Sequence, residues 1–218
     1  MQSSKTIIVP PKGSVKPTHS LIWLHGLGDS AQGFAGMFQQ TSPVSPTTKV
    51  ILLTAPNSPV TINGGAQMNS WFDIMDFSWA PQSYSVQDVH NSSKKVLEVI
   101  EAEIQAHEGD ASKVFIGGFS QGCCMSLNIG LTYEKKLGGI IALSGVLLPH
   151  VEIKQSDIPI LSSHGTDDKI VGFQLAVKSY ERIKQLSNFS WHPIGGLAHS
   201  LSGETLKHIK TFWQKHAK

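Results

Sequence analysis

Ser120 lies at the centre of the segment Gly-Phe-Ser-Gln-Gly, residues 118–122, and this Gly-x-Ser-x-Gly pattern is the clearest sign of chemistry in the sequence. The apolar run 113–116 precedes it, and a plausible helix over 124–129 follows. Between a strand and a helix, such a serine occupies a nucleophile elbow, where its hydroxyl is exposed and the helix start favours developing negative charge. Because the pattern also occurs in ordinary Gly-rich turns, the flanking elements carry the prediction that Ser120 is catalytic.

A serine hydroxyl is a weak nucleophile without a general base, and the base needs a carboxylate to orient it. In hydrolases with this elbow the three groups follow the chain order Ser, Asp, His. Asp167 and Asp168 lie beyond the predicted strand 158–162, and His199 lies in a Gly-rich loop before the last predicted helix. The order predicts a triad of Ser120, His199 and one of the two aspartates. The other aspartate would cap the following turn.

The sequence contains ten histidines, so residue type alone does not identify a general base. His192 lies within a predicted strand, where we expect a packed or surface side chain. We expect six others in loops or on solvated helix faces, without a chemical role: His19, His90, His107, His150, His208 and His216.

Acyl transfer also needs two hydrogen-bond donors for the oxyanion, one from the residue after the nucleophile and one from the loop after an early strand. Gln121 follows Ser120, and the loop 25–30, His-Gly-Leu-Gly-Asp-Ser, follows the predicted strand 20–24. A phosphate-binding loop is the alternative for this Gly-rich segment, but the sequence has neither Gly-x-x-x-x-Gly-Lys-Ser/Thr nor Gly-x-Gly-x-x-Gly there. Without His-Glu-x-x-His, Cys-x-x-Cys or clustered carboxylates, a metal site is not indicated.

These residues need a sheet whose strands end along one edge. Short β-branched runs alternate with helical segments, which predicts an α/β fold with a mostly parallel central sheet and helices on both faces. One helix has an apolar side from Val89 to Ile104 and ends before Gly109. Surface loops are predicted at 41–48 and 57–69. The expected strands are 6–9, 20–24, 49–53, 113–116, 139–143, 158–162 and 189–193, and two further helices are expected at 173–186 and 203–215.

Composition limits the class of protein. A length of 218 residues suits one α/β domain over residues 1–218. Eighteen Lys and Arg against 16 Asp and Glu give a net charge of +2, without the basic excess that nucleic-acid binding requires. The charged fraction of 16% is too low for a disordered chain. We therefore expect a globular protein that does not bind nucleic acid.

The remaining composition bears on cell compartment and assembly. The two cysteines are neighbours, so no disulfide framework is predicted. No apolar run approaches the ~18 residues of a membrane span, and the first residues lack the pattern of a signal peptide. We expect a soluble, cytoplasmic protein with at most peripheral membrane contact. The oligomeric state stays open, with a weak homodimer among the alternatives.

With these motifs the chain resembles the acyl-protein thioesterase and lysophospholipase type of carboxylesterase, a branch of the α/β-hydrolases. The resemblance extends over nearly the whole length, and several motifs in the right order are more specific than one. The matching segments are His25-Gly26-Leu27-Gly28-Asp29, Thr54-Ala55-Pro56, Ser70-Trp71-Phe72-Asp73, Gly117-Gly118-Phe119-Ser120-Gln121-Gly122, Leu143-Ser144-Gly145, His164-Gly165 with Asp168, and His199-Ser200.

The resemblance implies an α/β-hydrolase fold and roles for five residues. Ser120 would be the nucleophile, His199 the general base and acid, and Asp168 the orienting carboxylate, because it is the fifth residue of the family's His-Gly-x-x-Asp motif. Leu27 and Gln121 would supply the oxyanion N–H groups. The implied substrates are thioesters of S-acylated (palmitoylated) proteins, lysophospholipids and carboxylic esters, bound in an acyl channel without a cofactor. A small-ester carboxylesterase and a hydrolase-fold ligand-binding protein are the alternatives.

The chain departs from the family pattern in three places. The segment 145–149, Gly-Val-Leu-Leu-Pro, lacks the family's tryptophan, which predicts an acyl pocket of different shape. Cys123 and Cys124 replace small residues after the elbow; we expect them in the core, with sensitivity to oxidation as the alternative. The apolar and aromatic loop 74–84 is expected to form a lid over the acyl chain. The residues expected to contact the acyl group are Trp71, Met75, Phe77, Trp79 and Val146.

Overall fold

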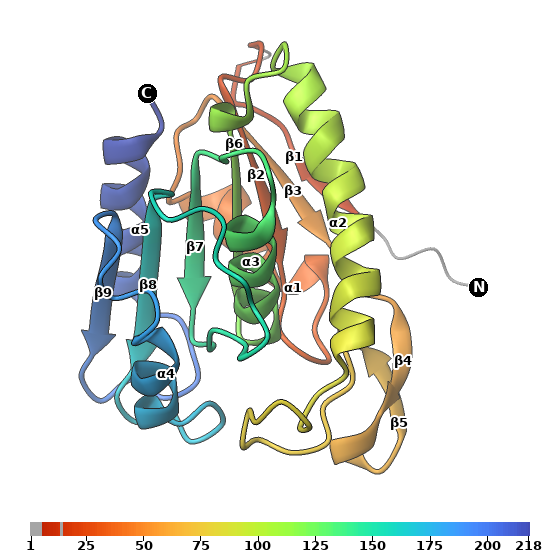
Figure 1. The fold of residues 1–218 in the computed structure, drawn as a ribbon. Coiled ribbons are helices and arrows are strands. Elements are labelled where there is room, and N and C mark those ends of the chain that lie inside the picture. The colour runs from red at the N-terminus through yellow and green to blue at the C-terminus, as the bar shows by residue number, and fades with distance from the viewer. Residues whose placement is uncertain (1–5, 14) are drawn as a thin grey trace.

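Seven strands form one sheet in the computed structural model, which describes residues 6–13 and 15–218. The strand order is β1-β3-β2-β6-β7-β8-β9; β1 is antiparallel to β3, and the other neighbours are parallel. The carboxyl ends of the parallel strands meet at the lower edge in Figure 1. The strands are β1 (Ile7–Val9), β2 (His19–Leu24), β3 (Thr48–Leu53), β6 (Val114–Phe119), β7 (Gly139–Leu143), β8 (Ile160–Gly165) and β9 (Phe189–Ile194).

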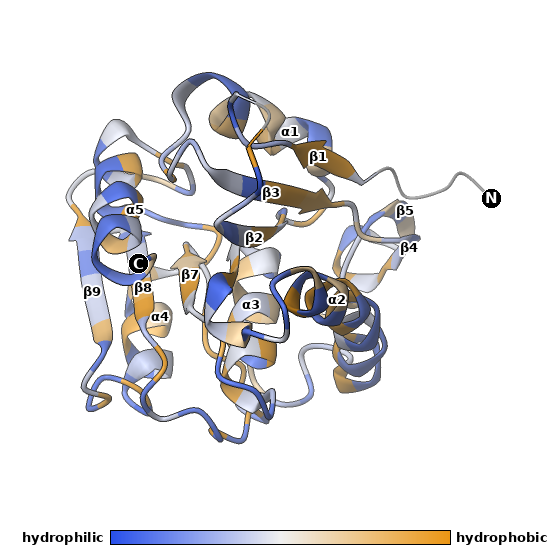
Figure 2. Cartoon of the chain, turned by 90° about the horizontal axis from the view of Figure 1, so that it is seen from above, coloured by the Kyte–Doolittle hydropathy of each residue, from blue (hydrophilic) through white to orange (hydrophobic). Residues whose placement is uncertain are grey.

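Helices cover both faces of this sheet. Residues of α2, α3 and α4 pack in one apolar cluster, and residues of α1 and α5 pack in a second one. Seen from above, α1 lies on one side of the sheet and α2 and α3 on the other (Figure 2). The mostly parallel α/β architecture expected from the sequence is therefore confirmed. The helices are α1 (Ala31–Gly36), α2 (Val86–Ala106), α3 (Gln121–Thr132), α4 (Phe173–Tyr180) and α5 (Gly203–His216).

The second strand illustrates why continuous apolar runs form the centre of the sheet. In β2, Ile22 and Leu24 join the cluster under α2 and α3, whereas Leu21 and Trp23 join the cluster under α1 and α5. Successive side chains of a strand point to opposite faces, so the four residues 21–24, which are covered on both faces, are all apolar. Burial of this strand fixes its register beside β6, which ends at the elbow.

Two expectations about secondary structure were wrong. The segment 57–69 is not a loop but a hairpin, formed by β4 (Asn57–Val60) and β5 (Ala66–Asn69). Its turn uses Gly64 and Gly65 at positive φ, which glycine adopts without the steric cost of a Cβ. Helix α4 ends at Tyr180 rather than at 186, and in the turns that follow, the side chain of Arg182 donates hydrogen bonds to carbonyls of the 148–151 segment.

The other predicted elements are present with shifted ends. The strands expected at 113–116 and 158–162 extend to Phe119 and Gly165. Both extensions lead the chain further toward the edge where the chemistry is expected. In the described ranges no helix has the length and hydropathy needed to cross a bilayer.

Candidate active site

Ser120 occupies the sharp turn between β6 and α3. Its backbone has φ 57° and ψ −117°, a conformation that is costly for a residue with a side chain. The turn is possible only because glycines flank it: a Cβ on Gly122 would lie 2.1 Å from the carbonyl oxygen of Leu24, and one on Gly118 would lie 2.4 Å from the backbone of Gly122. The tight packing of strand against helix thus holds the serine at the sheet edge, where it is half-buried.

The expected base and acid lie beside this serine. His199 Nε2 is 2.9 Å from Ser120 Oγ, and His199 Nδ1 is 2.7 Å from Asp168 Oδ2. A carboxylate only accepts hydrogen bonds, so the proton of the neutral ring belongs on Nδ1, and Nε2 accepts from the serine hydroxyl. The three side chains come from the ends of β6, β8 and β9, as a parallel sheet with loops at one edge permits.

The structure distinguishes between the two candidate aspartates. Asp168 is 5% exposed, and its Oδ1 accepts hydrogen bonds from the amides of Ile170 and Val171, both at 2.9 Å. Asp167 is exposed, and its carboxylate accepts a hydrogen bond from the Thr166 hydroxyl. Only Asp168 is brought to His199. The two amide bonds fix the carboxylate in the orientation that the histidine requires.

His164 lies beneath the acid, and sequence reasoning assigned it no chemical role. Its Nε2–H donates to the carbonyl of Val171 at 2.8 Å and lies 3.2 Å from Asp168 Oδ2. Burial lowers the pKa of His164, so its ring is neutral around pH 7. The His-Gly-x-x-Asp spacing could have predicted this contact, because it places the side chains of His164 and Asp168 four residues apart across one turn.

The proposed oxyanion donors, Leu27 and Gln121, belong to two segments that meet at the elbow. Gln121 begins α3, where an amide has no intrahelical acceptor. The loop that carries Leu27 touches the elbow, because a Cβ on Gly26 would lie 3.3 Å from Ser120 Cβ. Among the hydrogen bonds of the described residues, neither the Leu27 amide nor the Gln121 amide is a donor. Both N–H groups therefore remain available beside the serine.

The residues expected to contact an acyl chain separate into three groups. Trp79 and Val146 are buried and line a cavity of about 430 Å³, together with Leu147 and Leu175. Val146 follows Gly145, on which a Cβ would lie 2.7 Å from the carbonyl oxygen of Ser120, so Val146 links the cavity wall to the segment that packs against the elbow. Met75 and Phe77 are each 41% exposed and do not line it. Trp71 is 4% exposed, and its indole N–H binds the carbonyl of His25.

The loop 74–84 is closed at its base by a bridge between Ile74 and Tyr84. Trp79 at its tip has φ +57°, and its buried indole N–H has no partner in the described part of the chain. The loop therefore holds an aromatic side chain over the cavity in an unfavourable backbone conformation.

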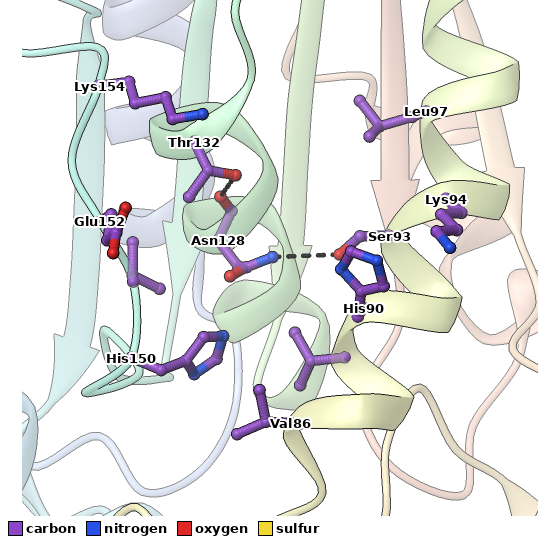
Figure 3. A pocket seen from close by; sticks show the side chains of 12 residues that line it. Val86, His90, Ser93, Lys94, Leu97, Asn128, Thr132, His150, Glu152 and Lys154 are labelled. Carbon is purple, nitrogen blue, oxygen red and sulfur yellow. Dashed lines mark hydrogen bonds between the residues drawn. The ribbon is translucent and has the colours of Figure 1, made fainter.

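A second hollow of about 320 Å³ lies between α2, α3 and the 150–154 segment (Figure 3). His90, His150 and Lys94 face it, and a hydrogen bond of 3.1 Å from Asn128 to Ser93 joins the two helices at its floor. Asn128 follows Ser120 by eight residues, which is about 12 Å along the helix axis. The lining of this hollow includes His90 and His150 but none of Ser120, Asp168 and His199.

For one of the remaining histidines, His19, the predicted position in a loop or on a solvated helix face was wrong. His19 is not solvated but lies in β2, 5% exposed, with its ring against Phe115 and Trp213. The strand begins one position earlier than expected because His19 pairs with Thr48 of β3. His192 lies in β9 as expected, and its ring stacks on that of His208 at a centroid distance of 4.2 Å.

Cys123 and Cys124 are buried in the first turn of α3, which confirms that they are core residues. Burial raises the pKa of Cys124 to about 12 and raises the pKa of Cys123 as well. Both thiols are therefore protonated at neutral pH, and a protonated thiol is a poor nucleophile and a poor target of oxidation. In residues 6–13 and 15–218, no three His, Cys, Asp or Glu side chains are grouped so that they could bind a metal ion.

Comparison with known proteins gives consistent results. Residues 5–217 match the model of the phospholipase/carboxylesterase family. The chain is 34% identical over 213 residues to acyl-protein thioesterase 1 of Debaryomyces hansenii, covering 91% of this chain and 92% of the relative. It is 36% identical to acyl-protein thioesterase 1 of Schizosaccharomyces pombe, covering 96% and 95%.

Solved structures give the same relationship. The crystal structure of Arabidopsis thaliana SOBER1 superimposes with a TM-score of 0.82 at 33% identity, covering 92% of this chain and 99% of that one. Zea mays acyl-protein thioesterase 2 superimposes with a TM-score of 0.83 at 23% identity, covering 99% and 100%, which supports the fold alone.

Proposed function

The chain belongs to the phospholipase/carboxylesterase family and is an ester or thioester hydrolase, and we propose that Ser120, His199 and Asp168 form its catalytic triad. The proposed substrates are acyl thioesters of S-acylated proteins, lysophospholipids and carboxylic esters of long acyl chains. The observation that supports the triad most directly is the chain of two contacts, 2.9 Å and 2.7 Å, from the serine hydroxyl through the imidazole to a buried carboxylate.

In the first half of the reaction, Ser120 Oγ attacks the acyl carbonyl carbon while its proton passes to His199 Nε2. The carbonyl oxygen becomes an oxyanion, and the amides of Leu27 and Gln121 donate hydrogen bonds to it. Collapse of this intermediate breaks the bond to the thiol or alcohol, which leaves with the proton from His199. The acyl group is then an ester of Ser120.

In the second half, a water molecule replaces the leaving group. His199 Nε2 takes a proton from this water, whose oxygen attacks the acyl carbon, and the same N–H then returns the proton to Ser120 Oγ as the acid is released. Asp168 keeps the Nδ1–H of His199 oriented and stabilises the imidazolium in both halves. Its amide partners keep this carboxylate in place throughout.

The cavity beside Val146 supports a preference for long acyl chains. Its walls are mostly apolar, and its volume of about 430 Å³ lies in the range of pockets that enclose small organic ligands. Burial of each CH₂ contributes ~0.8 kcal/mol, which corresponds to about a fourfold change per CH₂ in kcat/KM. We therefore expect kcat/KM for p-nitrophenyl esters to rise steeply with chain length until the cavity is filled.

The alternative within the same enzyme class is a small-ester carboxylesterase. A matched panel separates the two: p-nitrophenyl esters of increasing length, an acyl-cysteine peptide and a lysophospholipid. A flat profile across chain length would favour the small-ester enzyme. Preference for the acyl-cysteine peptide over the oxygen ester of the same chain would assign the thioester as the substrate.

The triad itself is tested by Ser120→Ala. Removing the nucleophile should reduce kcat by a factor on the order of 10⁶ if the three groups act as a unit. The parent protein should also be labelled at Ser120 by a fluorophosphonate, and the variant should not. Retained hydrolysis in the folded variant would contradict the assignment, and absence of labelling in the folded parent would favour a ligand-binding protein instead.

A further inference from the structure

Residues 69–72, here called the bridging segment, connect the two loops that carry the proposed oxyanion donors. The segment leaves the hairpin at the end of β5 and runs between the loop 25–29 and the start of α3. It includes the first three residues of the Ser-Trp-Phe-Asp motif at 70–73, to which the proposed mechanism gives no role. Its hydrogen bonds extend in both directions, toward Leu27 on one side and Gln121 on the other.

On the first side, the bridging segment holds the loop 25–29 both before and after Leu27. The indole N–H of Trp71 donates to the carbonyl of His25 at 2.9 Å. The carbonyl of Asn69 accepts from the amide of Gly28 at 2.8 Å, and its side-chain amide donates to the carbonyl of Asp29 at 2.8 Å. Leu27 therefore lies between two fixed positions, with its own N–H left unengaged among the described residues.

The ring of His25 tightens the same loop from within. His25 Nε2 accepts from the amide of Ala55 at 3.0 Å, so the ring proton lies on Nδ1, which donates to the carbonyl of Gly26 at 2.6 Å. Burial lowers the pKa of His25, which keeps the ring neutral and this arrangement intact around pH 7. The ring centroid lies 5.3 Å from that of Trp71. The carbonyls of His25 and Gly26, the two residues before Leu27, are thus both fixed.

On the second side, the side chain of Gln121 binds the bridging segment. Its Oε1 accepts from the amide of Trp71 at 2.8 Å, and its Nε2 donates to the carbonyl of Phe72 at 2.7 Å. This side chain is 1% exposed, so both bonds are shielded from water. The carbonyl of Trp71 accepts from the Ser92 hydroxyl of α2 at 2.5 Å, which anchors the segment to the rest of the fold.

We infer that Trp71 is a positioning residue that sets the distance between the two oxyanion donors. Its backbone binds the side chain of one donor residue, and its indole binds the loop of the other, so the two amides cannot shift independently. This inference rests on the proposed function. Preorganised donors stabilise the transition state because no reorganisation is needed during the reaction, and a shift of either amide therefore lowers kcat more than it weakens substrate binding.

The test compares Trp71→Phe with a matched control, Trp213→Phe. Both tryptophans are nearly fully buried, and both substitutions remove the same atoms. The indole N–H of Trp213, however, has no hydrogen-bond partner in the described part of the chain, whereas that of Trp71 holds His25. Loss of a complete oxyanion donor lowers kcat 10²- to 10³-fold, so displacement of one should lower it about 10-fold in Trp71→Phe, with KM within about twofold.

The decisive measurement uses an oxygen ester and its thiono analogue, in which C=S replaces C=O. Sulfur accepts hydrogen bonds poorly, so kcat/KM for the oxygen ester divided by kcat/KM for the thiono ester measures how well the two N–H donors bind the developing anion. We expect this ratio to fall about 10-fold in Trp71→Phe and to stay at the parent value in Trp213→Phe. Asn69→Ala, which removes the bond to Asp29, should lower the ratio in the same direction.

An unchanged ratio in a folded, less active Trp71→Phe would overturn the inference, because structural damage slows both substrates equally. An equal fall in Trp213→Phe would do the same. The proposed function has a separate failure: it is contradicted by turnover in Ser120→Ala, whatever the ratio in the tryptophan variants.

Discussion

Replacing Asp168 by asparagine tests the orientation of the imidazole with the smallest change of shape. In the parent, Asp168 Oδ2 accepts from His199 and Oδ1 accepts from the amides of Ile170 and Val171. Asparagine keeps the volume but turns one of these two acceptors into a donor. The side chain must therefore present its NH₂ group either to the histidine or to the two amides.

The hydrogen-bond count decides which orientation is adopted. An NH₂ group facing Ile170 and Val171 would leave two amides unsatisfied, at about 1–3 kcal/mol each when buried. An NH₂ group facing His199 keeps the bonds to His199 and to both amides if the ring changes tautomer, so that Nδ1 accepts and Nε2 carries the proton, and it loses only the 3.2 Å contact with the His164 N–H, which keeps its bond to Val171. The orientation with NH₂ toward His199 therefore has the lower free energy, and in it His199 Nε2 can no longer accept the proton of Ser120. By analogy with the same change in a serine protease triad, kcat should fall about 10⁴-fold, ~5.4 kcal/mol in the barrier.

The assay is steady-state hydrolysis of a p-nitrophenyl ester, with thermal unfolding as the check on folding. The neighbouring Asp167→Asn is the matched control: its carboxylate is exposed and, within residues 6–13 and 15–218, bonds only the Thr166 hydroxyl, so kcat should stay within about threefold. An Asp168→Asn variant that keeps a tenth of the parent activity, or equal losses in the two variants, would refute this reasoning.

Three further predictions follow from buried groups. Trp79→Ala removes an aromatic wall of the apolar cavity and should lower kcat/KM for long-chain esters at least tenfold more than for acetate esters; equal losses would argue against an acyl site there. Burial lowers the pKa of His25 and of His164 from 6.5, so on acidification the unfolded chain binds protons that the folded chain does not. The free energy of unfolding should therefore be highest above about pH 6.5 and should fall as the pH is lowered, which urea titrations at about pH 7.5 and pH 5.5 would measure. Cys123 and Cys124 should resist iodoacetamide at about pH 8 in the folded protein and react in denaturant; rapid labelling of the native protein would contradict their burial.

The parts of the fold and site that sequence predicts are those fixed by local patterns. The seven strands could be located because apolar β-branched runs are bounded by turn residues, and the order of Ser120 and His199 along the chain placed them at strand ends. A parallel sheet brings such ends to one edge, so proximity in space followed from the order of elements. The individual hydrogen bonds between these side chains could not be predicted, because they depend on the conformations of the loops that follow the strands.

The parts that could not be predicted depend on contacts across long separations. Only the family resemblance distinguished Asp168 from Asp167; periodicity cannot, since the choice depends on which carboxylate the amides of 170 and 171 turn inward. Trp71 was expected to contact the acyl group, and its hydrogen bond was not predicted. Its indole binds a carbonyl 46 residues earlier in the chain. The hairpin 57–69 was missed because its strands are polar and exposed, and their pairing depends on the two glycines of the turn.

The conformation of Ser120 has a thermodynamic consequence for inactive variants. A positive φ at a residue with a Cβ costs of order 1–3 kcal/mol, and glycine adopts it without that cost. Ser120→Gly should therefore abolish turnover and yet melt at a higher temperature than the parent, whereas Ser120→Ala keeps the Cβ and the strain. The thermostability of this chain is thus limited in part by the side chain that its chemistry requires, and selecting variants for heat resistance alone would favour loss of the nucleophile.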